Sequence, residues 1–125
     1  MTPTILVAED NDLVRHLLDQ LLRSAGYQVL LAADGEELLR LALAARPDLV
    51  LTDLEMPLLD GIDAIRRLRA DARTTALPLL AMSARDDNAG LALDAGADDF
   101  VVKPFAITWL LNLVAEHLRR VHTRQ

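Results

Sequence analysis

The sequence contains no cysteine. Disulfide cross-links and thiol chemistry are therefore excluded, and the composition is compatible with a reducing compartment. No apolar run approaches the roughly 20 residues that a membrane-spanning helix needs. The first residues, Met1 to Thr4, have neither the charged nor the apolar region of a signal peptide. We therefore expect a soluble domain in the cytoplasm.

Basic residues are in deficit: 13 lysines and arginines face 19 acidic residues, and the net charge is −6. Nucleic acids and anionic membrane surfaces need a basic footprint, so neither is expected as a direct partner. The length of 125 residues, with 52% hydrophobic and 26% charged residues, predicts a single globular domain over residues 1–125. Residues 119–125 are expected to be either a frayed helix end or the stub of a linker.

Apolar residues alternate between two periods along the chain. Segments with helical spacing separate five short runs of strand character, which are Ile5–Ala8, Val29–Ala32, Leu49–Thr52, Leu79–Met82 and Phe100–Val102. Asn11 or Asp12 is expected to cap the first helix and Asp34 the second, while Gly26 and Gly96 follow predicted helix ends. Strand–helix alternation with almost wholly apolar strands predicts an α/β fold, with a parallel sheet covered by helices on both faces.

The last predicted helix carries one stripe of apolar residues in steps of three and four, namely Ile107, Leu111, Val114, Leu118 and Val121. We expect this stripe to face the core. Since core packing accounts for the stripe, the stripe is not evidence for dimerisation through this helix. We expect a monomer or a weak homodimer.

Polar side chains follow four of the five predicted strands. Glu9 and Asp10 come after the first strand, Asp53 after the third, Ser83 after the fourth and Lys103 after the fifth. Taken singly, an acid or a serine there is an ordinary helix cap or turn residue. In an open parallel sheet, however, ligands bind outside the carboxyl ends of the strands. The sequence therefore predicts that these side chains gather at one edge of the sheet.

Three ionised carboxylates at one edge repel one another, and burying them is costly without a counter-charge. Lys103 would supply one cation, as a compact charge on a flexible stem. A hard divalent metal would supply another, and an oxygen-only ligand set favours Mg²⁺ or Mn²⁺ over Zn²⁺. A carboxylate nucleophile, a metal, a lysine and a hydroxyl are the parts that phosphoryl transfer requires. The pattern predicts that Asp53 is a nucleophile at a metal site.

The segments ILVAEDN, LTDLEMPLLDG, MSA and GADDFVVKPF resemble the receiver domain of two-component response regulators, and the resemblance covers essentially the whole chain. It implies a CheY-like, flavodoxin-like (βα)5 fold: a three-layer sandwich whose parallel five-stranded sheet has the order 2-1-3-4-5. It implies that Asp53 is the phosphoacceptor. It also implies that Asp10, Asp53 and the backbone carbonyl of Glu55 are ligands of Mg²⁺, with Glu9 completing the acidic pair.

The same resemblance implies that Ser83 bonds the phosphoryl group, that Lys103 pairs with it, and that Phe100 is the aromatic residue of the switch. It also implies a cis peptide bond before Pro104. The expected partner is a histidine kinase or a histidine phosphotransfer protein, which donates to Asp53 in a Mg²⁺-dependent reaction. Output is expected through the face made by the fourth helix, fifth strand and fifth helix. The domain would catalyse only its own phosphorylation and dephosphorylation, and the downstream effector is not indicated.

Two features depart from or extend the family pattern. The segment from Ser83 to Lys103 is shorter than is usual in the family, so we expect the fourth helix or its entry loop, around residues 86–90, to be truncated or displaced. Glu55 and Arg85 match positions that tune hydrolysis of the aspartyl phosphate. We hypothesise that these two side chains form an ion pair over the site; the alternative is that both are solvated, because exposed pairs contribute little.

Three other functions compete with a receiver. Dehalogenase-type phosphatases use an aspartate pair after the first strand and a cap insertion. Here the nucleophile candidate, Asp53, follows the third strand, Asp53 and Glu55 are not an aspartate pair, and the chain has no room for a cap. A nucleotide-binding enzyme would need glycines where the loop Glu9 to Asp12 is acidic. A pseudo-receiver, which only binds partners, would not need the full set of acids with Ser83 and Lys103. The receiver hypothesis is therefore preferred.

Overall fold

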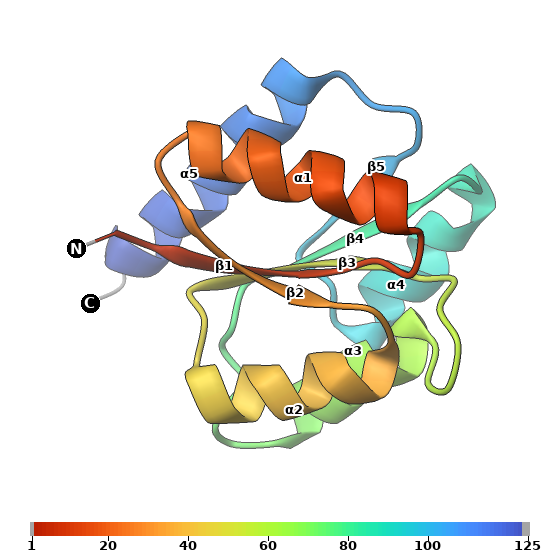
Figure 1. Cartoon of the computed structure of the whole chain (residues 1–125). Helices are drawn as coiled ribbons and strands as arrows, with labels where there is room; N and C mark the ends of the chain where they lie inside the picture. Colours follow the sequence, from red (N-terminus) through yellow and green to blue (C-terminus); the bar gives the residue numbers. More distant parts are fainter. Residues whose placement is uncertain (1, 124–125) are drawn as a thin grey trace.

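Five parallel strands form one sheet, in the order β2-β1-β3-β4-β5, in the computed structural model of the chain, which describes residues 2–123 (Figure 1). The strands are β1 (Thr4–Ala8), β2 (Gln28–Ala32), β3 (Leu49–Asp53), β4 (Leu79–Ser83) and β5 (Asp99–Val102). The helices are α1 (Asp12–Ser24), α2 (Gly35–Ala45), α3 (Gly61–Ala70), α4 (Ala89–Ala95) and α5 (Ile107–Thr123), with a short 3₁₀ helix η1 (Asp86–Asn88) before α4. The predicted α/β fold and strand order are confirmed.

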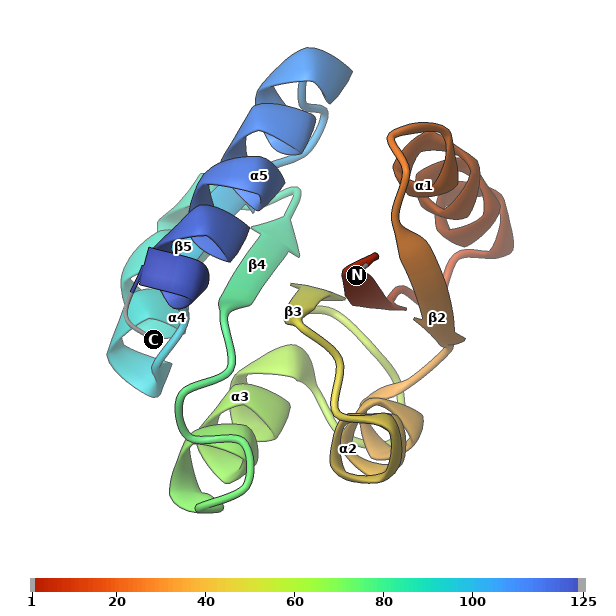
Figure 2. The same ribbon diagram turned by 90° about the vertical axis from the view of Figure 1, so that its left-hand side faces the viewer.

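The sheet lies between two layers of helices, with α1 and α5 on one face and α2, α3 and α4 on the other (Figure 2). Successive side chains of a strand point to opposite faces. Leu6 and Val50 therefore join the core under α2 and α3, while Ile5 and Leu51 join the core under α1 and α5. Each fully buried aliphatic side chain of this kind contributes about 1.5–3 kcal/mol, so packing on both faces stabilises the central strands.

Side-chain caps begin the helices directly after the strand ends. Asn11 Oδ1 accepts a hydrogen bond from the Val14 N–H, and Asp34 Oδ1 accepts one from the Glu37 N–H. Both caps are as predicted, and each satisfies a backbone donor that the first helical turn leaves free. The loops after β1 and β2 are therefore short, with α1 beginning at Asp12 and α2 at Gly35, and Glu9 and Asp10 stay close to the sheet.

The helix after β4 is short. α4 has 7 residues, and η1 adds 3 before it. This agrees with the expectation that the segment around residues 86–90 is truncated, and it places residues of η1 directly beside the end of β4.

The predicted core stripe of α5 was wrong in part. Ile107 is 42% exposed and Leu111 is only half-buried, whereas Leu110 and Leu113 are buried with Val114 and Leu118. α5 begins with several adjacent apolar residues, so periodicity alone does not choose between neighbouring faces. The docking of the helix against the sheet makes that choice. The Val121 side chain lies outside the described residues.

None of the helices within residues 2–123 is both long enough and apolar enough to cross a membrane.

Gly35, the first residue of α2, is packed against the backbone before α3. A Cβ atom at this position would lie 1.9 Å from the Leu59 carbonyl oxygen. We expect Gly35→Ala to lower the free energy of unfolding by about 1–3 kcal/mol, the usual cost of overpacking. The control is Gly90→Ala in α4, where an added Cβ meets nothing within 4 Å; it should raise stability by about 0.5–1 kcal/mol. Urea denaturation measures both, and equal effects would contradict the close approach at Gly35.

Candidate functional site

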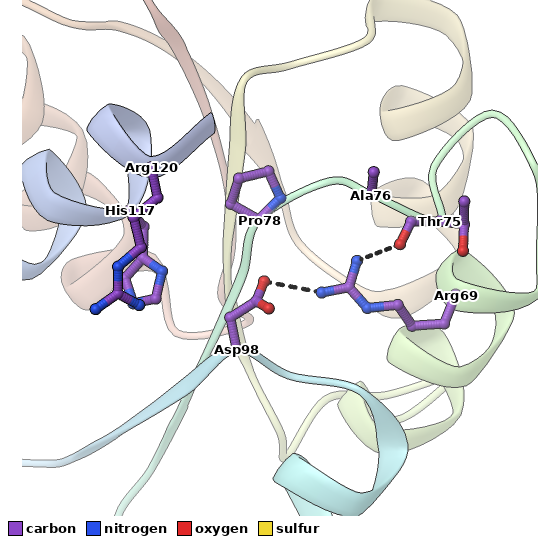
Figure 3. Close-up of a pocket in the computed structure, with 7 residues that line it drawn as sticks. All are labelled: Arg69, Thr75, Ala76, Pro78, Asp98, His117 and Arg120. Carbon is purple, nitrogen blue, oxygen red and sulfur yellow. Dashed lines mark hydrogen bonds and ion pairs between the residues drawn. The ribbon is translucent and has the colours of Figure 1, made fainter. Parts of the chain in front are cut away.

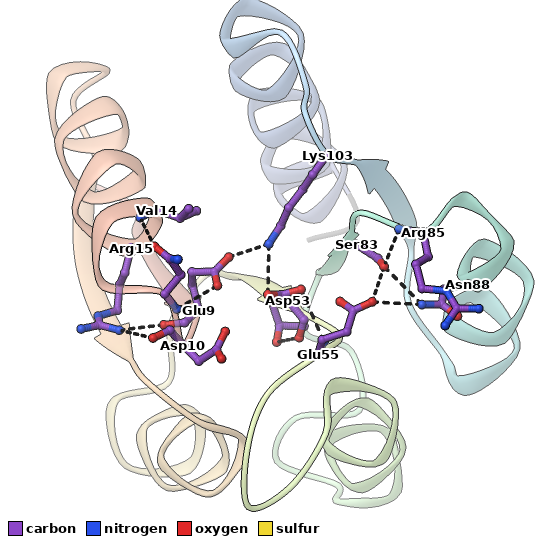
Figure 4. A network of polar contacts seen from close by, with 12 residues as sticks. Glu9, Asp10, Val14, Arg15, Asp53, Glu55, Ser83, Arg85, Asn88 and Lys103 are labelled. Carbon is purple, nitrogen blue, oxygen red and sulfur yellow. Dashed lines mark hydrogen bonds and ion pairs between the residues drawn. The ribbon is translucent and has the colours of Figure 1, made fainter.

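The carboxyl ends of β1, β3, β4 and β5 bring the predicted polar residues to one edge of the sheet (Figure 4). Glu9 is 1% exposed and Asp53 is 4% exposed, while Asp10 is open to solvent. Each of these three acids has a carboxylate oxygen within 4.8 Å of the others. Asp53 and Ser83 are the last residues of β3 and β4, so both are held by the sheet itself. The predicted gathering of acids is therefore present.

Lys103 provides the cation that buried acids need. Its Nζ donates hydrogen bonds to Glu9 Oε1 at 2.7 Å and to Asp53 Oδ2 at 3.0 Å. Burial lowers the pKa of Lys103, but its bonds to Glu9 and Asp53 outweigh this, and the net pKa is raised. Burial likewise opposes the charged form of Glu9, yet the bonds from Lys103 and the Asn11 N–H bring the pKa of Glu9 below its usual value. Lys103 and Glu9 therefore form a charged pair.

The charged form of Asp53 is disfavoured at this site. Burial, and then the neighbouring Glu55 side chain, raise the pKa of Asp53 to about 7, although Lys103 acts in the opposite direction. Burial and the adjacent Glu9 also raise the pKa of Asp10. One lysine does not neutralise three carboxylates, so the site retains an excess of negative charge that a further cation would relieve.

The donor set fits a hard divalent cation. All of the candidate ligand atoms are oxygens: the carboxylates of Asp10 and Asp53, and the backbone carbonyl of Glu55, which follows Asp53 by two residues. Such ligands suit Mg²⁺, which also keeps several waters. The acids line an open cleft of about 730 Å³, together with Asn11, Val14, Glu55, Ala84, Arg85 and Lys103. This cleft has room for a metal with its waters and a phosphoryl group.

Ser83 is fully buried, and its hydroxyl is held by three neighbours. It donates to Glu55 Oε1 at 2.5 Å, and it accepts from the Arg85 N–H at 3.0 Å and from Asn88 Nδ2 at 3.2 Å. Asn88 Nδ2 is also 3.1 Å from Glu55 Oε1. Asn88 was not predicted as a site residue, because only the 3₁₀ turn of η1 brings it back over the end of β4.

The hypothesised ion pair between Glu55 and Arg85 does not form. Arg85 instead pairs with Asp87, at 3.1 Å between Nη2 and Oδ2, and Glu55 turns to Ser83 and Asn88. Arg85 immediately precedes η1 and Asp87 lies within it. Because the two residues are close in sequence, their ion pair costs less conformational entropy than a pair between two separate loops. Any effect of Arg85 on hydrolysis therefore cannot rest on that pair in this conformation.

The predicted switch aromatic, Phe100, lies in β5 opposite Ala81 of β4. Its side chain is half-buried and packs against the core under α2, α3 and α4. The Lys103–Pro104 peptide bond is cis, as the resemblance implied.

A second hollow, of about 260 Å³, lies at the opposite end of the sheet between Arg69, Pro78, Asp98 and His117 (Figure 3). The Arg69 guanidinium there donates to the carbonyls of Gly96, Thr75 and Leu77 and pairs with Asp98 at 2.9 Å. Its donors tie loops together, so this arginine is a structural cross-link. The acidic cleft remains the candidate site.

Comparison with known proteins gives a consistent result. Residues 5–115 match the family model described as "Response regulator receiver domain". The chain is 44% identical over 122 residues to the response regulator MprA of Mycolicibacterium vanbaalenii, covering 96% of this chain and 52% of that protein. It is 40% identical over 121 residues to the transcriptional regulatory protein PrrA of Mycobacterium tuberculosis, covering 95% and 51%.

A solved structure supports the same relationship. The receiver domain of the sensor histidine kinase PA1611 from Pseudomonas aeruginosa has a TM-score of 0.88 and 33% identity, covering 94% of this chain and 98% of that one. That structure has a magnesium ion coordinated in its active-site cleft. The chain spans about half the length of the curated relatives it matches.

Proposed function

The chain belongs to the family of response regulator receiver domains, which accept a phosphoryl group in two-component signalling, and from this premise we propose that Asp53 is its phosphoacceptor. The observation that carries the proposal is the placement of one buried carboxylate, Asp53, between the ammonium group of Lys103 and the exposed acid Asp10 at the carboxyl edge of the sheet. No other aspartate within residues 2–123 has both neighbours.

In the proposed reaction, a carboxylate oxygen of Asp53 attacks the phosphorus of a phosphohistidine in line. The new O–P bond forms as the P–N bond breaks, and its electron pair leaves with the ring nitrogen of histidine. The Lys103 ammonium and the Ser83 hydroxyl would each contact a phosphoryl oxygen. Mg²⁺, or Mn²⁺ in its place, held by Asp10, Asp53 and the Glu55 carbonyl, would neutralise charge on the transferred group. The product is an aspartyl phosphate.

The proposed donor is a histidine kinase or a histidine phosphotransfer protein. Exposed apolar side chains lie on α1 and near the start of α5: Leu17 is 51% exposed, Ile107 is 42% exposed and Trp109 is 47% exposed. Leu17 and Ile107 line a groove that shares Lys103 with the cleft. A protein surface docked there would present its phosphohistidine to Asp53.

We propose output through α4, β5 and α5, with Ser83 and Phe100 as the switch residues and Glu55 and Arg85 as modulators of hydrolysis. The downstream effector is not specified by the described residues. The net charge of −6 supports a protein partner over direct nucleic-acid or membrane binding. We also propose that residues 1–125 form a single domain, with a tail or linker stub at 119–125. The proposed location is the cytoplasm, and the proposed oligomeric state is a monomer or weak homodimer. The domain is proposed to catalyse only its own phosphorylation and dephosphorylation, and no separate substrate is proposed.

Intact-mass spectrometry after incubation with acetyl phosphate tests this function. We expect the mass of one phosphoryl group to be added in the presence of Mg²⁺, and no addition when the metal is removed by EDTA. Binding of Mg²⁺ is measured separately, by its effect on thermal stability. An adduct that forms equally well without a divalent metal, or metal binding without any adduct from either acetyl phosphate or a phosphorylated kinase, would contradict the proposal.

A further inference from the structure

The Ser83 hydroxyl has no free bonding capacity in this structure. Its proton is directed to Glu55 Oε1 at 2.5 Å, and its oxygen accepts the Arg85 N–H and lies 3.2 Å from Asn88 Nδ2. A hydroxyl has one proton to donate, so Ser83 cannot donate to Glu55 and to a phosphoryl oxygen on Asp53 at the same time. The bond to Glu55 must break before Ser83 can contact the phosphoryl group.

Asn88 contacts both partners of the Ser83–Glu55 hydrogen bond. Its amide nitrogen lies 3.1 Å from Glu55 Oε1 and 3.2 Å from Ser83 Oγ, and the residue ends η1 immediately before α4. Glu55, Ser83 and Asn88 come from the β3–α3 loop, the end of β4 and η1, so the three side chains connect three separate segments (Figure 4). A bond to a charged carboxylate is stronger than one between neutral groups, which favours the closed arrangement while Asp53 is unmodified.

We propose that Glu55, Ser83 and Asn88 form a latch that holds the Ser83 hydroxyl away from the phosphoacceptor, and that Asn88 is a positioning residue acting through Ser83. The latch rests on the proposed function of the site. Phosphorylation of Asp53 opens it, because the phosphoryl oxygens compete with Glu55 for the Ser83 proton and their negative charge repels Glu55. Asn88 then loses one of its two partners, which frees the entry to α4.

The latch predicts that removing Asn88 favours the phosphorylated arrangement. Asn88→Ala changes no charge, and it should bind the phosphoryl analogue beryllofluoride, in the presence of Mg²⁺, about fivefold more tightly than the unmodified chain, the factor that one net hydrogen bond supplies. In a Ser83→Ala background the same substitution should have no effect, because the latch has no hydroxyl to hold. Asn112→Ala, at an exposed position of α5, is the matched control. NMR titration gives the affinities.

Hydrogen exchange provides a readout that does not depend on phosphoryl chemistry. The Arg85 N–H donates to Ser83 Oγ, so freeing Ser83 in Asn88→Ala should speed exchange of that amide about fivefold. An unchanged Arg85 exchange rate, weaker beryllofluoride binding, or an equal effect in the Ser83→Ala background would each overturn the latch. Failure of the unmodified chain to bind beryllofluoride would instead count against the proposed function, and the exchange rates would then decide the latch alone.

Discussion

Replacing Asp53 by asparagine will abolish phosphorylation by acetyl phosphate, with a rate at least about a thousandfold below that of the unmodified chain. An amide oxygen at this position has nearly the shape of the carboxylate but is not an effective nucleophile. The fold should be retained, because the substitution removes a buried carboxylate whose pKa is raised to about 7 by burial and the nearby Glu55. Intact-mass spectrometry over a time course measures the rate.

The matched control is Asp94→Asn, the same substitution at an exposed position of α4, which should be phosphorylated like the unmodified chain. Circular dichroism spectra of both variants establish that they are folded. An adduct that persists at full rate in Asp53→Asn would assign the phosphoacceptor to another residue. Asp10, the exposed acid of the same cluster, would then be examined first by peptide mapping.

Replacing Lys103 by alanine should slow phosphorylation about 100- to 1000-fold, the usual cost of removing one preorganised donor to developing charge. Lys103 Nζ lies 3.0 Å from Asp53 Oδ2, within reach of a group transferred to that carboxylate. The affinity for Mg²⁺ should not fall and is expected to rise, because the ammonium competes with a metal cation for the same acids. The two measurements are the initial rate with acetyl phosphate and a Mg²⁺ titration.

The opposite signs of these two effects separate a role in the chemistry from general disruption of the site. A damaged cleft would lose phosphorylation and metal affinity together. Arg66→Ala removes a cation from an exposed ion pair of α3 and serves as the charge-matched control, which should change neither quantity appreciably. A Lys103→Ala variant phosphorylated at the unmodified rate would show that the lysine only compensates the charge of Glu9 and Asp53.

Much of the fold and the site was predictable because both depend on patterns local to the chain. Apolar runs such as Leu49–Thr52 identified the strands, and Asn11 and Asp34 identified helix starts. All strands of a parallel sheet end at the same edge, so the residues at or just after the ends of β1, β3, β4 and β5 had to converge there. The acids, the serine and the lysine were therefore assigned to one site without any knowledge of distances.

The choice of partner within that site was decided only in the tertiary structure. Glu55 bonds to Ser83 and Asn88 and does not form the hypothesised pair with Arg85, which pairs with Asp87 instead. The buried face of α5 likewise fell on Leu110 and its neighbours, leaving Ile107 exposed. Apolar periodicity predicts which face of a helix is buried only to within part of a helical turn. Hydrogen bonds and ion pairs depend on separations of a few tenths of an ångström between elements, and these are set only when the helices dock on the sheet.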